Sequence, residues 1–235
     1  RQFGIKTITV NSYQSVSGAG YPGLSSFDIT DNCIPYIKGE EEKIVKEIKK
    51  ILTIDPEVYA FTVRVPVMFG HLETVWLDLE KDVECEDIIK AWADFKEVQD
   101  LPSTPSQPIV YSAEDTFPQP KYAFWGNPKG MVVYTGRIRK KGGKIGFCLL
   151  VNNIVKGAAG GSIQNAEAFV SRYGLRSSIV SRIDLPSGLS TGKVIFMRLK
   201  LPCKVLKPLH LPVVDNGPRY LSHFVQASTG IDSPH

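Results

Sequence analysis

Residues 58–79 have the sequence VYAFTVRVPVMFGHLETVWLDL, and this stretch decides the fold class. Residues 58–68 and 73–79 are rich in β-branched and aromatic side chains, which favour strands. Pro66 and Gly70 interrupt the stretch, because proline cannot donate to a strand ladder and glycine permits a bend. The sequence therefore predicts two strands joined by a bend rather than one long strand.

The rest of the chain supplies further strands and helices around this pair. Alternating or β-rich runs predict strands at residues 5–10, 109–112 (a short edge strand), 131–139, 144–151 and 193–200. Helical patterns cover residues 40–52, 86–96 and 157–173, and the first has an apolar stripe of Ile44, Ile48, Ile51 and Leu52. The run KKGGK between the strands 131–139 and 144–151 predicts a hairpin turn. The run at 17–23, SGAGYPG, is predicted to be neither helix nor central strand. This order predicts an α+β fold with a mixed, mostly antiparallel sheet and helices on one face.

Composition excludes several classes of protein. The chain has 235 residues, 43% of them apolar and 22% charged, which is ordinary for a globular protein. It has no run of about 18 apolar residues, so we expect no membrane span. Its four cysteines are widely spaced and its four histidines form no HxxxH pair, so we expect no metal site and a reducing compartment.

The charge distribution separates residues 176–235 from the rest. This tail holds eight Lys/Arg and three Asp/Glu, whereas the remainder holds 20 and 21. Proline and leucine interrupt the basic residues, so the tail is too sparse for a nucleic-acid interface and we expect no such partner. We expect one domain over residues 1–175 and an atypical, poorly ordered basic tail over 176–235.

Three groups of residues carry candidate chemistry. Arg64 offers a planar fork for a carboxylate, and His71 can move a proton near neutral pH. An offset of seven on an unbroken strand would put them on opposite faces, but a bend can bring both to one cavity. Glu40 and Lys43 lie on one face of the predicted helix 40–52. The alternatives are a surface arginine with a histidine at a strand end, and a solvated helix start.

Two glycine-rich segments also attract interest. Tyr13-Gln14 precedes Ser17-Gly18-Ala19-Gly20, where backbone can approach a ligand closely, although the segment can also be a simple turn. Residues 152–161, NNIVKGAAGG, lead a polar cap into a helix start that can bind an anion. Small residues there equally permit close packing of another element.

Taken in order, these segments resemble one enzyme family. NSYQSVSGAGYPG, FTVRVPVMFGHLETVWLDL and GFCLLVNNIVKGAAGGSIQNAE together resemble aspartate-semialdehyde dehydrogenase, particularly its archaeal and fungal branch. The resemblance covers residues 3–175. It implies a C-terminal domain of the glyceraldehyde-3-phosphate-dehydrogenase type, and NADPH-dependent reductive dephosphorylation of aspartyl 4-phosphate to aspartate semialdehyde in lysine, threonine and methionine biosynthesis. It also implies a cytoplasmic homodimer or homotetramer.

The resemblance implies a role for each matching substrate-site residue. Gln14 would orient the substrate beside a thiol, and His71 would be the acid/base. Arg64 would hold the substrate carboxylate, Glu40 would face the amino group, and Lys43 would help to bind phosphate. The assignment of Glu40 could shift by one, because two more glutamates follow it.

The resemblance likewise implies a cofactor-binding edge. Ser17, Gly18, Ala19 and Gly20 would line the nicotinamide side of NADP, and Asn153 would contact the cofactor from the closing helix. In this family the nucleophilic cysteine and the nucleotide domain precede the SGAG segment, so we expect this chain to be an incomplete subunit, inactive alone. Two alternatives stay open: a non-catalytic dimerising module of the same fold, and a CoA-thioester reductase of the malonyl-CoA type.

Two cysteines need separate mention. Cys33 falls at an apolar position of the family pattern, and a thiol needs a nearby cation or helix N-terminus to become a good nucleophile. We therefore expect Cys33 and Cys148 to be core residues.

Overall fold

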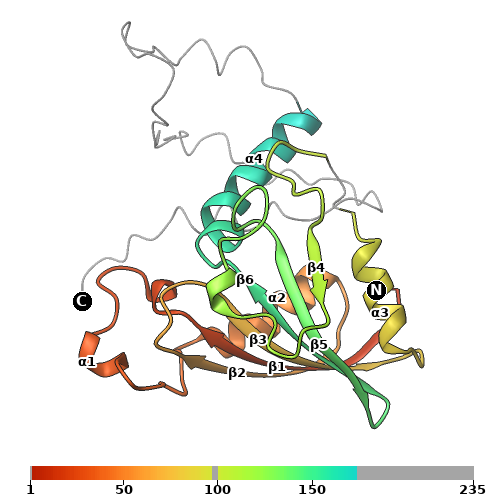
Figure 1. The fold of residues 1–235 in the computed structure, drawn as a ribbon, viewed down its shortest axis with the longest axis horizontal. Helices are drawn as coiled ribbons and strands as arrows, with labels where there is room; N and C mark the ends of the chain where they lie inside the picture. The colour runs from red at the N-terminus through yellow and green to blue at the C-terminus, as the bar shows by residue number, and fades with distance from the viewer. Residues whose placement is uncertain (1, 97–99, 174–235) are drawn as a thin grey trace, which may run out of the picture.

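A computed structural model describes residues 2–96 and 100–173, which form a six-stranded sheet with three main helices (Figure 1). The spatial order of the strands is β2-β1-β3-β6-β5-β4. The strands are β1 Ile5–Gln14, β2 Glu57–Arg64, β3 His71–Leu79, β4 Ile109–Ser112, β5 Val133–Lys141 and β6 Lys144–Val151. The helices are α1 Ser26–Ile29, α2 Glu40–Leu52, α3 Cys85–Ala93 and α4 Gly160–Tyr173, with short helical turns η1 Val16–Ala19, η2 Pro120–Tyr122 and η3 Val155–Ala159.

The sheet is mixed, and its three central pairs are antiparallel. β1 pairs with β3, β3 with β6, and β6 with β5 in antiparallel fashion. The two edge strands run parallel to their neighbours, β2 to β1 and β4 to β5. Helix α2 connects the parallel pair β1 and β2, as a parallel connection requires. The predicted fold class is confirmed.

The bend in the decisive stretch lies where proline and glycine predicted it. β2 ends at Arg64, two residues before Pro66, and so is shorter than the predicted strand 58–68. β3 begins at His71, directly after Gly70, whose φ of 89° belongs to the left-handed region. The segment between them therefore reverses direction and places β2 and β3 on the two sides of β1.

Helices α2 and α3 cover the same face of the sheet. Three apolar residues of α2 pack on β1 and β3, namely Ile44, Ile48 and Leu52 on Ile8, Val10 and Val75. In α3, Ile88 and Trp92 pack with Leu79 and Ile145. Each such side chain stabilises the fold by roughly 1.5–3 kcal/mol when fully buried. Ile51, predicted to belong to the apolar stripe of α2, is 41% exposed.

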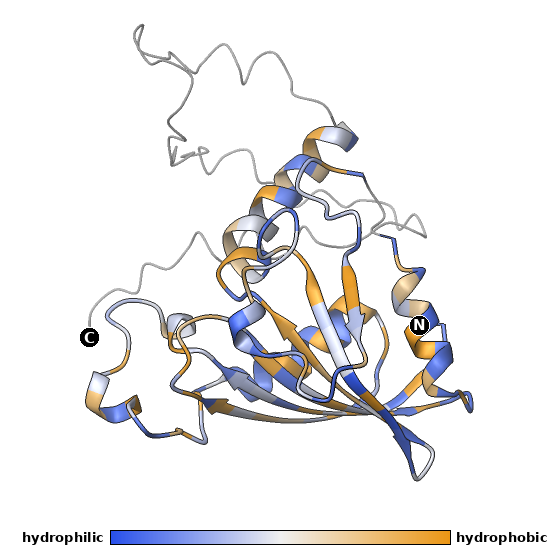
Figure 2. Ribbon diagram, in the orientation of Figure 1, coloured by the Kyte–Doolittle hydropathy of each residue, from blue (hydrophilic) through white to orange (hydrophobic). Residues whose placement is uncertain are grey.

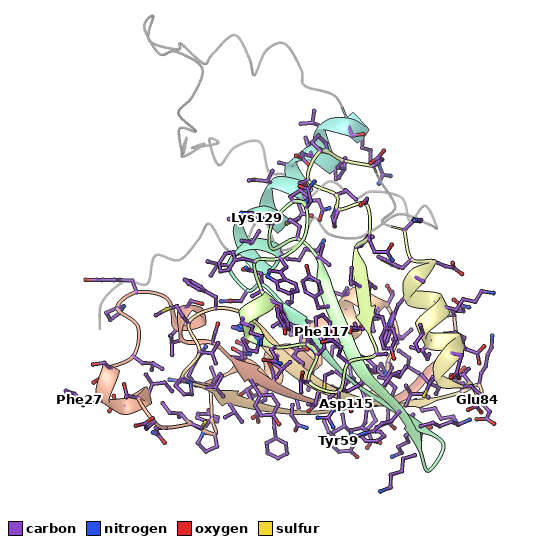
Figure 3. All side chains as sticks on the ribbon, viewed as in Figure 1. Phe27, Tyr59, Glu84, Asp115, Phe117 and Lys129 are labelled. Carbon is purple, nitrogen blue, oxygen red and sulfur yellow. The ribbon has the colours of Figure 1, made fainter. Side chains whose placement is uncertain are left out.

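The other face of the sheet is covered only in part. The loop before β5 packs Phe117 and Val132 onto Tyr134 and Leu150. Towards β2 this face is open: Tyr59 is 52% exposed and Phe61 is 65% exposed. Tyr59 lies along the lower side of the sheet in Figure 3. Figure 2 shows that the tip of the β5–β6 hairpin, the predicted KKGGK turn, is hydrophilic.

The C-terminal helix differs from the predicted helix 157–173. Its first turn, η3, has π-helical geometry, and α4 then continues to Tyr173. It extends beyond the end of the sheet rather than across a face (Figure 1). Glu167 of this helix contacts the loop between α3 and β4, where its carboxylate accepts hydrogen bonds from Ser103 N at 3.0 Å and Ser103 Oγ at 2.6 Å.

Several other predictions have clear outcomes. The edge strand at 109–112 is confirmed, whereas the SGAG segment, predicted to be non-helical, forms the 3-10 turn η1. A 3-10 turn of four residues can form in this glycine-rich segment because it needs few i→i+3 hydrogen bonds. Cys33 is exposed, so its assignment to the core is wrong: it lies between the short helix α1 and Ile34, which forms an isolated bridge with Arg64 at the edge of the sheet. Cys148 is only partly buried. The predicted strand 193–200 and the tail 176–235 lie outside the described residues.

Candidate functional site

The candidate site lies where β1 and β2 end and β3 begins. Gln14 and Arg64 are register partners in the parallel pair of β1 and β2. Tyr13 pairs with Leu72, so the antiparallel ladder brings His71 beside Gln14 on the other side of β1. Because side chains of paired residues share a face, the carboxamide, guanidinium and imidazole project from the face that α2 covers. The bend at Pro66–Gly70 therefore lets Arg64 and His71 share a face, whereas an offset of seven on an unbroken strand would put them on opposite faces.

Arg64 and His71 converge on Gly18, next to the buried Gln14. Gln14 and Arg64 are each only 6% exposed. A Cβ atom placed on Gly18 would lie 2.9 Å from Arg64 Nη1 and 3.2 Å from His71 Nε2. The tips of both side chains therefore meet beneath the backbone of η1. The SGAG segment forms one wall of the same site.

The N-terminus of α2 adds two charged groups to this site. Glu40 and Lys43 form an ion pair, with Oε1 and Nζ 3.3 Å apart, and their side chains are 25% and 54% exposed. Glu40 acts electrostatically on both Arg64 and His71. Glu41 instead turns to β2, where its carboxylate accepts the backbone N–H of Thr62 at 2.9 Å. The candidate among the three glutamates is therefore Glu40.

The environment keeps His71 neutral at pH 7. Burial, followed by the positive charge of Arg64, lowers the pKa of His71 to about 4, and Glu40 only partly opposes these effects. Burial also lowers the pKa of Arg64, which Glu40 offsets in part, and Arg64 stays charged. A neutral imidazole beside a buried guanidinium can accept a proton from a reacting group.

Ser15 was not predicted as a functional residue, yet it lies at the centre of the site. Its carbonyl accepts a hydrogen bond from Arg64 Nη1 at 2.7 Å. Its backbone N–H and its hydroxyl both lie 3.2 Å from His71 Nδ1. Ser15 is fully buried. In the sequence it is one more small polar residue beside a glycine-rich turn, so no local pattern distinguishes it.

Asn153 ties the loop after β6 to the two other segments of the site. Its Oδ1 accepts hydrogen bonds from Gly70 N at 3.0 Å and from Ser15 Oγ at 3.2 Å. Its Nδ2 donates to Ser17 Oγ at 2.9 Å. The predicted cofactor-side residues Ser17 and Asn153 are therefore in contact, and Asn153 holds η1 against the start of β3.

The glycine-rich helix start has a polar cap and, at Gly160, close packing, whereas anion binding there stays a prediction. Asn152 Oδ1 accepts the backbone N–H groups of Ile154 and Val155, which is a helix cap. A Cβ on Gly160 would lie 2.5 Å from Met131 Sδ, so close packing requires glycine there. At Gly157 the nearest atom would be 3.6 Å away, which leaves ordinary space.

Gly18→Ala tests the convergence of Arg64 and His71. The new methyl group would occupy the space between the two side-chain tips, so both must shift. Because a shift approaching 1 Å in a catalytic site can cost about 10²-fold, we expect kcat/KM to fall by roughly 10- to 10²-fold. Steady-state kinetics measures this, in the complete dehydrogenase that the sequence resemblance implies. Gly142→Ala, in the open hairpin tip, is the control, and equal activity of both variants would contradict the geometry.

The arrangement suits a small ligand that carries charges of both signs. A buried guanidinium can bind a carboxylate, a carboxylate at a helix start can bind an ammonium group, and an exposed lysine can bind an anion. Within residues 2–96 and 100–173, no cluster of three or more His, Cys, Asp or Glu side chains could hold a metal ion.

Comparison with known proteins identifies the family of the chain. The sequence pattern of the family described as "Semialdehyde dehydrogenase, dimerisation domain" matches residues 1–156, which include every candidate site residue. The chain belongs to the semialdehyde dehydrogenase family. The SGAG and RVPVMFGH segments and the first half of NNIVKGAAGG lie within the matched residues, and the fold brings them to one place.

Individual members of the semialdehyde dehydrogenase family are similar over the same region. Aspartate-semialdehyde dehydrogenase from Archaeoglobus fulgidus is 42% identical over 178 residues, which cover 71% of this chain and 51% of that protein. Malonyl CoA reductase (NADP) from Metallosphaera sedula is 36% identical over 188 residues, covering 73% and 53%. The chain therefore spans about half the length of the curated relatives it matches.

Solved structures show the same fold. Aspartate semialdehyde dehydrogenase from Candida albicans, solved with NADP, aligns with a TM-score of 0.64 and 29% identity over 73% of this chain and 52% of that one. Aspartate semialdehyde dehydrogenase II from Vibrio cholerae, solved with ASA, aligns with a TM-score of 0.61 and 28% identity over 73% and 56%. The resemblance stated from the sequence is confirmed.

Proposed function

We propose that this chain is the substrate-binding and dimerising part of an NADP-dependent aspartate-semialdehyde dehydrogenase. The reaction is the reductive dephosphorylation of aspartyl 4-phosphate to aspartate 4-semialdehyde, a step that feeds lysine, threonine and methionine synthesis in the cytoplasm. The observation that carries the proposal is the meeting of Arg64 and His71 beneath Gly18, beside the buried Gln14. Residues 1–175 form the functional domain in this proposal, and 176–235 are an appended basic tail.

Each charged residue has one role in substrate binding. Arg64 holds the α-carboxylate of the substrate by paired hydrogen bonds. Glu40 faces the ammonium group, and Lys43, the more exposed partner of their ion pair, turns to the phosphate. Binding of substrate replaces the Glu40–Lys43 pair by two pairs with the ligand, so the charges of the site stay balanced.

Gln14 and His71 act on the reacting group. Gln14 orients the acyl carbon by hydrogen bonds from its buried carboxamide. His71, neutral at pH 7, accepts the proton of an attacking thiol and returns it to an oxygen later in the cycle. Burial raises the pKa of the Cys85 and Cys148 thiols, so neither of these is a good thiolate. In this proposal the nucleophilic cysteine belongs to the nucleotide-binding half that the sequence resemblance implies.

The SGAG segment fits the nicotinamide side of NADP. A Cβ on Gly20 would have no heavy atom within 4 Å, so the backbone there is open to a ligand. Ser17, Gly18, Ala19 and Gly20 would line the cofactor, and Asn153 would support them through its bond to Ser17. Bound NADPH supplies the hydride.

The open side of the sheet is the proposed subunit interface of a homodimer, or of a dimer within a homotetramer. Phe61→Glu puts a charge in this interface without touching the site on the other face. We expect dimers of the wild-type chain and monomers of the variant, measured by light scattering after size-exclusion chromatography. Phe95→Glu, an exposed aromatic after α3, is the control. Dimerisation unaffected by Phe61→Glu would place the interface elsewhere.

A CoA-thioester reductase is the second candidate, favoured by the similarity to the Metallosphaera sedula enzyme. Its substrate has no α-ammonium group and so has no use for Glu40. In the complete enzyme, Glu40→Gln should lower kcat/KM for aspartate semialdehyde by about 10- to 10²-fold, the value of one charged hydrogen bond. Activity with malonate semialdehyde should change little. The exposed Glu42→Gln is the matched control.

Outcomes of this experiment separate the candidates. A loss confined to aspartate semialdehyde supports the proposed reaction. Efficient turnover of malonate semialdehyde that ignores Glu40 would establish the CoA-thioester reductase instead. The absence of turnover with either substrate, in an enzyme that carries the cysteine and binds NADP, would favour a non-catalytic dimerising module.

In the described part of the chain no helix is long and apolar enough to span a membrane.

A further inference from the structure

Ser15 offers two different partners to one nitrogen of His71. Its backbone N–H lies 3.2 Å from Nδ1 and can only donate, so it stabilises a ring whose Nδ1 carries no proton. Its hydroxyl oxygen lies at the same distance of 3.2 Å and can accept, so it stabilises a ring whose Nδ1 is protonated. Nδ1 therefore has a partner in either state.

Two acceptors on the far side can take the proton of the Ser15 hydroxyl. Gly70 N–H donates to Asn153 Oδ1 at 3.0 Å, which identifies that atom as the amide oxygen, and Ser15 Oγ lies 3.2 Å from it. Ser15 Oγ also lies 3.1 Å from Ser17 Oγ, which either donates to it or accepts from it. When the Ser15 hydroxyl donates to either acceptor, a lone pair of its oxygen is left to face His71 Nδ1.

We propose that Ser15 is a positioning residue that lets His71 hold its proton on Nδ1 and so leaves Nε2 free to act as the base. The inference rests on the proposed function, in which His71 is the acid/base. Nε2 lies on the side of the ring that approaches Gly18: a Cβ placed there would be 3.1 Å from His71 Cε1 and 3.2 Å from Nε2. A proton acceptor is useful only there, because Nδ1 is turned towards the fully buried Ser15.

Other groups around the ring act in known directions. Arg64 and Lys43 disfavour the charged ring, whereas Glu40 and the backbone of Gly70 favour it. Loss of the Ser15 hydroxyl removes one acceptor for the Nδ1–H form, so it should shift the balance of the tautomers rather than abolish one of them. The expected change is about 2- to 10-fold in the tautomer ratio, as one neutral hydrogen bond gives.

Long-range ¹⁵N–¹H NMR of the ¹⁵N-labelled chain reports the two ring tautomers directly, without turnover. His71→Gln assigns the signals, since the chain has four histidines. At pH 7 the wild-type ring should contain the Nδ1–H form in measurable amount. Ser15→Ala should shift the ratio towards Nε2–H, and Ser15→Thr, which keeps the hydroxyl, should restore it.

Asn153→Ala gives a second test if Ser15→Ala does not fold. Without Oδ1 the Ser15 hydroxyl can turn its proton onto Nδ1, so the ratio should again move towards Nε2–H. A wild-type ring entirely in the Nε2–H form, or equal ratios in the wild type and the folded variants, would overturn the inference. A tautomer shift in Ser15→Ala with unchanged turnover of the complete enzyme would instead count against the acid/base role of His71.

Discussion

Replacing His71 by asparagine should lower turnover of the complete enzyme by about 10²- to 10⁴-fold, the range for loss of a general acid/base. Asparagine keeps a polar group near Ser15 but cannot accept a proton at neutral pH. Because the effect falls on the chemical step, kcat should fall while KM for aspartate semialdehyde changes little. Steady-state kinetics at saturating NADP and phosphate would measure both constants.

The pH profile provides the control for this prediction. The pKa of His71 is lowered to about 4, so the ring stays neutral and able to accept a proton as the pH falls from 7 towards 5. Protonation of His71 should therefore lower the kcat/KM of the wild type only as the pH approaches 4. The pH profile of the variant should lack this decrease. Near-normal turnover of His71→Asn at pH 7 would remove His71 from the acid/base role.

Arg64→Lys should lower kcat/KM by about 10²-fold, mainly through a higher KM. Lysine keeps the positive charge but loses the planar pair of donors that matches a carboxylate. It also leaves the carbonyl of Ser15 without the Nη1 donor at 2.7 Å, in a site where Arg64 is only 6% exposed. Losing one charge-assisted hydrogen bond costs about 1.5–3 kcal/mol, which corresponds to 10- to 10²-fold.

Arg139→Lys is the matched control for Arg64→Lys. Arg139 stacks over Trp76 on β3, with its guanidinium carbon 5.1 Å from the ring centroid, and has no contact with the candidate site. The control should keep KM within about twofold of the wild type, since surface changes have small effects. An unchanged KM in Arg64→Lys would show that the substrate carboxylate binds elsewhere.

Much of the fold could be predicted because local patterns decided it. The apolar spacing in residues 40–52 gave both ends of α2, and the glycines of the KKGGK turn gave the β5–β6 hairpin. Pro66 and Gly70 predicted the bend between β2 and β3. The exposure of Cys33 was missed because burial depends on which elements pack against a residue, and sequence spacing does not state this.

The site could be predicted only in part, for the same reason. Arg64 and His71 were candidates by chemistry, but their contact depends on β1 lying between β2 and β3, which is a long-range pairing. Ser15 and the bridging role of Asn153 were missed, since their hydrogen bonds join residues 56 and 138 positions apart. Such partners appear only once the sheet is assembled.

The structure of the complete enzyme with aspartate semialdehyde bound tests the central claim most directly. We expect the substrate carboxylate within hydrogen-bond distance of Arg64, its ammonium group at Glu40, and its reacting carbonyl between Gln14 and His71 Nε2. A ligand bound in a different part of the enzyme, out of contact with both Arg64 and His71, would contradict the proposed substrate site.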